Sequence, residues 1–192
     1  PAFEDEHGTY IMNSRDLRAI QHVHRLVEMG IDSLKIEGRT KSFYYCARTA
    51  QVYRKAIDAA GRGEAFNADW FLELEHLANR GYTDGFLQRH NHQDYQQYAR
   101  GNSASDTRQL VGEVTHGDSD WWYVEVKNRF SVNDKLEVMT PGGNTEFALT
   151  SLFSQQDEVL VVAPGSGYKV KIPAVEGFSP DMAMLLRCLK QP

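Results

Sequence analysis

Cysteine is scarce in this sequence: Cys46 and Cys188 are its two cysteines, they lie far apart, and no CxxC pair occurs. Structural zinc sites need closely spaced ligand pairs, and disulfide-stabilised domains need several cysteines. The chain therefore carries neither a metal-site spacing nor a disulfide framework. Low cysteine usage favours a reducing compartment, so we expect the protein in the cytoplasm.

Long apolar runs and the common catalytic motifs are missing as well. No run of about 18 apolar residues occurs, and the N-terminus lacks a basic-then-apolar signal, so we expect neither a membrane span nor secretion. No GxSxG, HExxH, Walker or GxGxxG motif is present, so these residues on their own do not indicate nucleophilic or zinc proteolysis. The sequence starts at Pro1 rather than at methionine. We expect a fragment of a longer protein.

The overall composition is that of a globular protein. The chain has 192 residues, of which 41% are hydrophobic and 24% charged, and these values are ordinary for one large or two small domains. The formal net charge of -5 argues against a globally basic nucleic-acid-binding protein, although a local basic patch stays possible.

The most informative stretch is Ile31–Arg39. Read with a period of two, Leu34 and Ile36 share one face while Lys35 and Glu37 share the other, so the pattern predicts a strand over 33–37. Amphipathic helix patterns flank it, which indicates an α/β layer whose apolar face is covered by helices. Functional side chains in such folds gather at the carboxyl ends of strands, where Glu37 and Arg39 fall. The alternative is an edge strand with one hydrated face.

Neighbouring patterns predict the rest of the first half. We expect a strand at 10–12, a helix capped by Asn13 or Ser14 and stopped by Gly30, a second helix over 41–60, a third from about 67 to 78, and a tight loop at 79–86. The order strand, helix, strand across 10–37 predicts parallel pairing through a right-handed crossover.

A polar stretch follows and separates two parts of the sequence that have different hydrophobicity patterns. Residues 88–108 are expected to form a linker between a domain at 1–87 and a domain at 109–192. His90 and His92 in this stretch have no acid or thiol cluster beside them, so we expect no metal site. Beyond it, seven alternating runs separated by turn residues predict a small antiparallel β-barrel or sandwich. A barrel is favoured because closure removes exposed edges. The runs are 110–115, 121–126, 135–140, 146–152, 158–163, 168–172 and 182–189.

Basic and aromatic residues alternate after the predicted strand. No acidic residue lies between Glu37 and Asp58, whereas this stretch contains Arg39, Lys41, Arg48, Arg54 and Lys55 with Phe43, Tyr44, Tyr45 and Tyr53. Such a mixture suits phosphates and unpaired bases. The alternative is a solvated helix face with its tyrosines in the core. A guanidinium at a strand end, as predicted for Arg39, is placed for bidentate binding of a phosphate or carboxylate.

At these residues the chain resembles the peptidase U-32 family, the collagenase-like proteases. The matching stretches are Asn13–Leu17, Ser33–Arg39 with Lys41, Tyr44 and Tyr45, Asn79–Thr83 with Gly85 and Phe86, and, in the second half, Val111–Gly112, Val124–Asn128, Phe130 and Asp134–Glu137. Within the family the likeness is greatest to bacterial members that hydroxylate the wobble uridine of tRNA to 5-hydroxyuridine with prephenate as co-substrate.

The resemblance implies an α/β plus all-β protein. The first half would be the last strand-helix units of a TIM-barrel-like catalytic domain, and the second half a β-barrel similar to the second domain of elongation factors. An iron-sulfur cluster would be held by cysteines upstream of Pro1, so this chain alone should be clusterless and inactive. Carried over by position, Glu37 and Lys35 are the catalytic candidates. The substrate-binding candidates are Arg39, Lys41, Tyr44, Tyr45, Asn13 and Arg80. The expected partner is tRNA. Two rival hypotheses are a peptidase acting on collagen-like chains and a non-catalytic module that binds RNA or protein.

Overall fold

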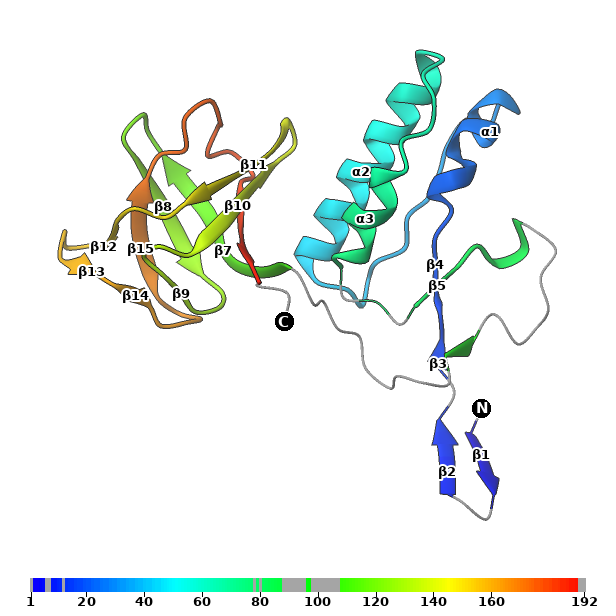
Figure 1. Ribbon diagram of the computed structural model, residues 1–192, viewed down its shortest axis with the longest axis horizontal. Coiled ribbons are helices and arrows are strands. Elements are labelled where there is room, and N and C mark those ends of the chain that lie inside the picture. The colour runs from blue at the N-terminus through cyan, green and yellow to red at the C-terminus, as the bar shows by residue number, and fades with distance from the viewer. Residues whose placement is uncertain are drawn as a thin grey trace. The chain divides into compact units, whose positions relative to one another are not determined.

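Helices occur in the first half of the chain and a large antiparallel sheet in the second (Figure 1). The computed structural model describes residues 2–5, 8–11, 13–77, 79, 81–87, 96–97 and 108–189. It divides into two compact units, residues 1–105 and 106–192, and each is described here by itself. The expected combination of a mixed α/β part and an all-β part is confirmed at this coarse level. None of the helices described is both long and apolar enough to cross a membrane.

Three helices make up the body of the first unit. They are α1 (Val23–Glu28), preceded by the 3-10 turn η1 (Ile20–His22), α2 (Phe43–Gly61) and α3 (Asp69–Glu75). Helix α2 packs on both α1 and α3. Its start follows from the sequence, because the Ser42 side chain accepts a hydrogen bond from the Tyr45 N–H at 3.2 Å. The core between the helices contains Ile20, Val23, Val52, Ala56, Trp70, Leu74 and Leu77.

Short strands complete the first unit. An antiparallel pair is formed by β1 (Ala2–Asp5) and β2 (Gly8–Ile11), and another by β3 (Asn13–Ser14) and β6 (Gln96–Gln97). The parallel pair is β4 (Asp16–Leu17) with β5 (Tyr82–Thr83), which precedes the 3-10 turn η2 (Gly85–Leu87). Backbone N–H groups of Asp16 and Arg18 donate to the carbonyls of Gly81 and Thr83 at 2.9 and 2.8 Å.

Three predictions for this half are wrong. Residues 31–38 form no strand, because a strand needs a partner for its backbone groups and no described segment pairs with them. The predicted crossover from 10–12 to 33–37 fails with it, and the parallel pair joins β4 to β5 instead. The predicted helix from Asn13 to Gly30 is regular only from Ile20 onward, since residues 16 and 17 are held in the β4–β5 ladder.

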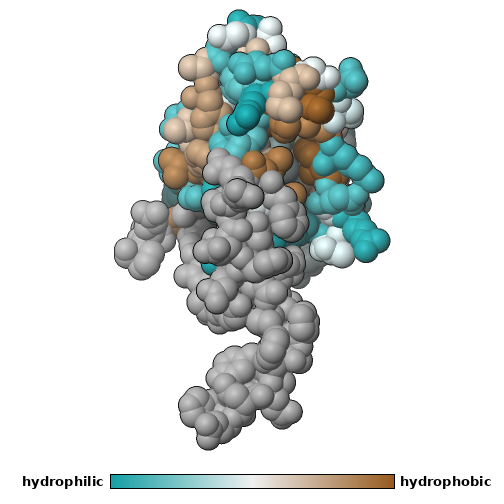
Figure 2. Space-filling view, turned by 90° about the vertical axis from the view of Figure 1, so that its right-hand side faces the viewer, coloured by the Kyte–Doolittle hydropathy of each residue, from teal (hydrophilic) through white to brown (hydrophobic). Residues whose placement is uncertain are grey.

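Several apolar side chains of this unit stay exposed. Phe43 is 78% exposed, Met29 67% and Leu17 64%, and Figure 2 shows apolar residues interspersed with hydrophilic ones on the face that it displays. These are side chains of the type that a complete α/β layer covers. The described residues do not complete that layer, so the TIM-barrel-like arrangement stays a prediction.

The second unit is built on one eight-stranded antiparallel sheet. Its order is β11-β10-β16-β7-β8-β15-β12-β13, and a separate pair joins β9 to β14. The strands are β7 (Arg108–Gly117), β8 (Trp121–Val126), β9 (Phe130–Ser131), β10 (Lys135–Thr140), β11 (Gly143–Ala148), β12 (Leu152–Ser154), β13 (Val159–Leu160), β14 (Val162–Ala163), β15 (Lys169–Pro173) and β16 (Met184–Cys188). Each predicted run contains or overlaps a strand. β9 and most of β12 were not predicted, and the run 158–163 is divided between β13 and β14. Closure into a barrel stays a prediction.

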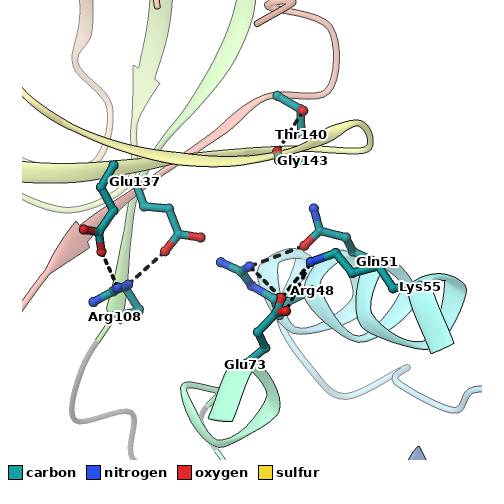
Figure 3. Close-up of polar contacts among 9 residues, drawn as sticks. Arg48, Gln51, Lys55, Glu73, Arg108, Glu137, Thr140 and Gly143 are labelled. Carbon is teal, nitrogen blue, oxygen red and sulfur yellow. Dashed lines mark hydrogen bonds and ion pairs between the residues drawn. The ribbon is translucent and has the colours of Figure 1, made fainter. Parts of the chain in front are cut away.

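A single apolar core fills the second unit. Alternate residues of each strand enter it, including Trp122, Phe130, Leu136, Leu152 and Ile172, all at most 1% exposed. On the outer side, Arg108 donates to Glu137 from Nε at 2.8 Å (Figure 3) and to Glu146 from its terminal nitrogen at 2.7 Å. These contacts tie β7, β10 and β11 together across the sheet.

A substitution at Gly112 tests this packing. Gly112 in β7 is buried, and a Cβ atom there would overlap Val124 Cγ1 of the neighbouring strand. We expect Gly112→Ala to lower the free energy of unfolding by roughly 1–3 kcal/mol, because a well-packed core has no room for another methyl group. Urea denaturation followed by tryptophan fluorescence measures it. Gly142→Ala is the control, since its new Cβ would meet Thr140 Oγ1 at an ordinary 3.8 Å. Equal losses in the two variants would contradict the close approach of β7 and β8.

Candidate functional site

A pocket of about 730 Å³ opens in the first unit beside the stretch 34–41. The other walls come from β4 and the residues on either side of it, and from α1, α2, α3 and β5. Its charged lining residues are Arg15, Arg18, Lys35, Arg39 and Lys41, which are basic, and Asp16 and Glu37, which are acidic. Its uncharged polar lining residues are Tyr45, Tyr53, Tyr82, Thr40 and Thr49. The excess of cationic groups favours an anionic ligand.

Asp16 and Lys41 form the best-defined ion pair of the pocket. Lys41 Nζ lies 2.7 Å from Asp16 Oδ2, and the Asp16 side chain is 6% exposed. The Lys41 ammonium also lies 4.7 Å from the centroid of the Tyr45 ring, within cation–π range. The pair fixes the segment after Gly38 to β4, so it holds the pocket wall in place.

Arg18 is fixed by two aromatic rings. Its guanidinium carbon lies 4.6 Å from the centroid of Phe71 and 4.4 Å from that of Tyr82, and one terminal nitrogen is 3.4 Å from Glu75 Oε1. A planar guanidinium stacks on rings in a way that a lysine ammonium cannot. Arg18 therefore joins β4, α3 and β5 at the pocket floor.

The buried hydroxyls of the pocket are neutral donors. Tyr82 donates to the Leu74 carbonyl at 2.7 Å, and burial, followed by the nearby Tyr45, raises its pKa. Tyr53 accepts a hydrogen bond from the Ala19 N–H at 2.8 Å, and burial raises its pKa also, which keeps its proton available. Thr49 is 6% exposed, and its Oγ1 has no hydrogen-bond partner within the described part of the chain. A buried, unpaired hydroxyl on a pocket wall is a ready contact for a ligand.

The two predicted catalytic residues lie at the mouth of this pocket. Lys35 Nζ is 2.9 Å from Glu37 Oε1, with side chains 83% and 68% exposed. They come from a segment that is not a strand, whereas the sequence predicted a strand over 33–37. Arg39 is exposed on the same wall and makes no hydrogen bond or ion pair with any residue that the structure describes. Its guanidinium is thus free to receive a ligand.

The other predicted binding residues divide into three groups. Lys41 and Tyr45 line the pocket. Tyr44 is 6% exposed and belongs to the buried face of α2, so it packs in the core instead. Arg80 lies outside the described residues, and so does the side chain of Asn13, whose backbone belongs to β3.

The basic and aromatic stretch does not form one surface. Arg48 is 2% exposed, its terminal nitrogen lies 3.5 Å from Glu73 Oε2, and Lys55 Nζ lies 3.0 Å from the same oxygen (Figure 3). Arg54 is paired with Asp58 one turn further along α2. Of the five basic residues predicted together, the pocket receives Arg39 and Lys41. The other three, Arg48, Arg54 and Lys55, form ion pairs within α2 or between α2 and α3.

Sequence reasoning missed Arg18, Thr49 and Tyr82 as pocket residues. Arg18 and Tyr82 meet through the β4–β5 ladder, which joins segments more than 60 residues apart. No local pattern carries such a contact. The predicted tight loop at 79–86 contains Tyr82 and could have indicated a functional residue there. Such a loop is equally typical of a purely structural role.

The arrangement suits binding of an anion next to a flat ring. Arg39 offers a fork of donors, Tyr45 a ring, and Thr49 and Tyr53 hydroxyls. Among the described residues no group of three or more histidines, cysteines or acids is placed to hold a metal ion.

Comparison with known families also divides the chain into two parts. The model described as Peptidase family U32 matches residues 2–97, and the model described as Peptidase family U32 C-terminal domain matches residues 106–187. The chain belongs to peptidase family U32. The pocket lies within the part matched by the first U32 model.

Two U32 relatives are similar over almost the whole chain. The tRNA hydroxylation protein P of Escherichia coli (strain K12) is 58% identical over 187 residues, which cover 97% of this chain and 41% of that protein. The protein of the same name from Haemophilus influenzae is 51% identical over 190 residues, covering 98% and 41%. The chain therefore spans about two fifths of the length of these relatives. Among solved structures, the C-terminal domain of a putative U32 peptidase from Geobacillus thermoleovorans is 20% identical, with a TM-score of 0.38, and covers 41% of this chain and 91% of that one.

The contacts predict different roles for the two basic residues. We expect Lys41→Ala to lower the free energy of unfolding by roughly 1–3 kcal/mol, because it removes a charged hydrogen bond from a buried carboxylate. Arg39→Ala should change it by less than about 0.5 kcal/mol, as is usual for an exposed side chain without structural contacts. Urea denaturation of both variants measures the difference. A large loss in Arg39→Ala would mean that Arg39 supports the fold, and its assignment as a ligand-binding group would fail.

Proposed function

We propose that the full-length protein is an enzyme that hydroxylates the wobble uridine of tRNA to 5-hydroxyuridine, with prephenate as co-substrate, in the cytoplasm. The observation that carries the proposal is the 58% and 51% identity, over nearly the whole chain, to relatives named tRNA hydroxylation protein P. The U32 family name alone is a weaker guide, because one fold supports many activities.

The pocket chemistry supports an anionic reactant. Prephenate carries two carboxylates and tRNA carries phosphates, and both suit a pocket with more basic than acidic lining residues. In this proposal Arg39 binds a carboxylate or phosphate, while the Tyr45 ring, beside the Lys41 ammonium, provides a flat contact. Lys41 keeps its place through Asp16.

Lys35 and Glu37 are the proposed acid–base pair. Their ion pair at the pocket mouth is largely in water, where such a pair contributes little. A bound substrate that excludes water would strengthen their interaction and make proton transfer to or from the substrate sensitive to both. The role proposed for them therefore depends on closure of the mouth by RNA.

Beyond the coarse fold, we propose that the first unit belongs to a TIM-barrel-like catalytic domain, and that the second is a barrel similar to the second domain of elongation factors. The exposed apolar side chains Leu17, Met29 and Phe43 support the first point, because further barrel units would cover them.

An iron-sulfur cluster does not fit the residues present. Such clusters are usually held by four cysteine thiolates. This chain has an exposed Cys46 in its first unit and a half-buried Cys188 in its second, and the described residues contain no ligand cluster. We propose that any cluster is bound by residues outside this chain. On that proposal this chain by itself is inactive.

Two other functions are tested alongside. A U32 peptidase should cleave gelatin, at a rate that falls in a Glu37→Gln variant and survives purification to homogeneity. A non-catalytic module should bind RNA or protein without altering it. The family name favours the first.

Nucleoside mass spectrometry of cellular tRNA tests the proposal. In cells that lack the full-length protein and any redundant pathway, we expect the intact gene to restore 5-hydroxyuridine derivatives, and an Arg39→Ala gene to restore at most about a tenth of that level, because a lost charged contact to substrate costs on the order of 1.5–3 kcal/mol. The matched control is Arg54→Ala, which removes an exposed arginine of α2 that does not line the pocket.

The possible results of this experiment distinguish the role of Arg39 from the activity of the protein. Full restoration by Arg39→Ala would remove Arg39 from the site but leave the enzyme assignment. An unchanged tRNA modification pattern after deletion of the gene would refute the enzyme assignment itself.

A further inference from the structure

A row of ring-bearing and apolar side chains crosses the outer face of the second unit. In the antiparallel register, His116 of β7 is opposite Tyr123 of β8, Tyr123 is opposite Lys171 of β15, and Lys171 is opposite Phe153 of β12. Phe153 in turn is opposite Val159 of β13. These five residues, with Trp121 on the same face of β8, are called the aromatic strip below. It spans five neighbouring strands.

The strip lies outside the core. Residues that alternate with it, namely Trp122, Val124, Leu152, Val170 and Ile172, are at most 1% exposed and fill the core. Successive side chains of a strand point to opposite faces, so the strip faces outward. His116 is exposed, Val159 is 76% exposed, and Trp121, Tyr123 and Phe153 are half-buried.

The strip side chains support one another. The His116 and Tyr123 rings stack with centroids 4.3 Å apart and an interplanar angle of 7°. Trp121 meets Phe153 edge to face at 5.1 Å. Lys171 Nζ lies 4.7 Å from the Trp121 centroid and is paired with the Asp157 carboxylate. These contacts hold the rings in fixed orientations, so little side-chain entropy is lost when a planar ligand stacks on them.

We propose that the aromatic strip binds a single-stranded segment of RNA by stacking of its bases, an inference that rests on the proposed tRNA substrate. Strands lie about 4.8 Å apart, so five strands give a strip of roughly 19 Å. Sheet surfaces that read single-stranded RNA stack two or three bases on rings of adjacent strands. The strip offers rings on three of its five strands, β7, β8 and β12. The strip belongs to the second unit, whereas the pocket belongs to the first.

The charge of the second unit indicates whether the strip would contact the phosphates or the bases of an RNA. Acidic residues outnumber basic ones over residues 108–189, so this unit does not attract the phosphate backbone strongly. Three acids near the strip are engaged within the protein: Asp157 with Lys171, Glu125 with Lys127, and Asp118 with the N–H groups of Asp120 and Trp121. Affinity therefore comes from stacking, and binding releases few counterions.

Fluorescence anisotropy with the full-length protein and a labelled, unstructured RNA oligonucleotide tests the strip. We expect Tyr123→Ala and Phe153→Ala each to weaken binding roughly tenfold, the scale of one lost base stack. Tyr123→Phe should keep most of the affinity, because the ring remains. The control is Tyr168→Ala, which removes a 55% exposed tyrosine that precedes β15 and is not in the strip. Circular dichroism melts establish that each variant is folded.

Salt dependence gives a second readout. Between 50 and 200 mM salt we expect the strip's contribution, the ratio of the wild-type and Tyr123→Ala affinities, to change less than about threefold, whereas a contact made through phosphates would lose affinity steeply.

Unchanged affinity in folded Tyr123→Ala and Phe153→Ala would overturn the proposal, and so would an equal loss in Tyr168→Ala. Binding of a protein in place of RNA would appear as these same unchanged RNA affinities.

The test is independent of catalysis. If the variants bind RNA weakly but cells without the gene keep normal tRNA, the strip stands and the proposed reaction fails. If 5-hydroxyuridine depends on the gene but the variants bind normally, the reaction stands and the strip fails.

Discussion

Asp16 is the residue on which the first unit depends most. Its backbone N–H enters the short parallel ladder to Gly81, and its carboxylate accepts the Lys41 ammonium at 2.7 Å. Three segments that are far apart in sequence meet at this one residue. The β4–β5 ladder has few hydrogen bonds. The ion pair between the buried Asp16 carboxylate and Lys41 therefore helps to fix how these segments are arranged. The pocket exists because these segments are held side by side.

Local features of the sequence predicted the elements whose partners are close in the chain. Helix α2 has its own cap at Ser42, and in the second unit β7–β8, β10–β11 and β12–β13 are pairs joined by short turns. The stretch 33–37 alternates equally well but is not a strand, because alternation describes a surface and a strand also needs a neighbour. For the same reason the β4–β5 pair, whose members are brought together over a long separation, was not predicted.

The pocket was predicted in part. Arg39, Lys41 and Tyr45 follow directly from the stretch that the sequence marked out, and they line the pocket. Arg18 and Tyr82 were missed, because a cation between two rings is assembled from three elements and leaves no spacing rule in the sequence. Tyr44 was predicted to bind substrate but is buried, since a helix turns adjacent residues to different faces and α2 assigns its neighbour Tyr45 to the pocket.

The two units present opposite chemistry to a nucleic acid. The first offers guanidinium and ammonium groups around a pocket, and the second offers fixed rings on a sheet whose surroundings are acidic. Phosphate contacts position a nucleic acid, while ring contacts engage its bases. On the proposed function, a polymer that carries both kinds of group would contact both units, whereas a small anion would contact the first alone.

The shared carboxylate of Glu73 has a consequence for how this protein can change over time. Arg48 and Lys55 both lie against it, from positions about two turns apart on α2. A substitution at either position changes the electrostatic environment of the other, so the free-energy effects of the two cannot be independent. Once one of the two cations is lost, the other becomes the main compensation for Glu73. The order in which substitutions arise at these positions then decides which of them are tolerated.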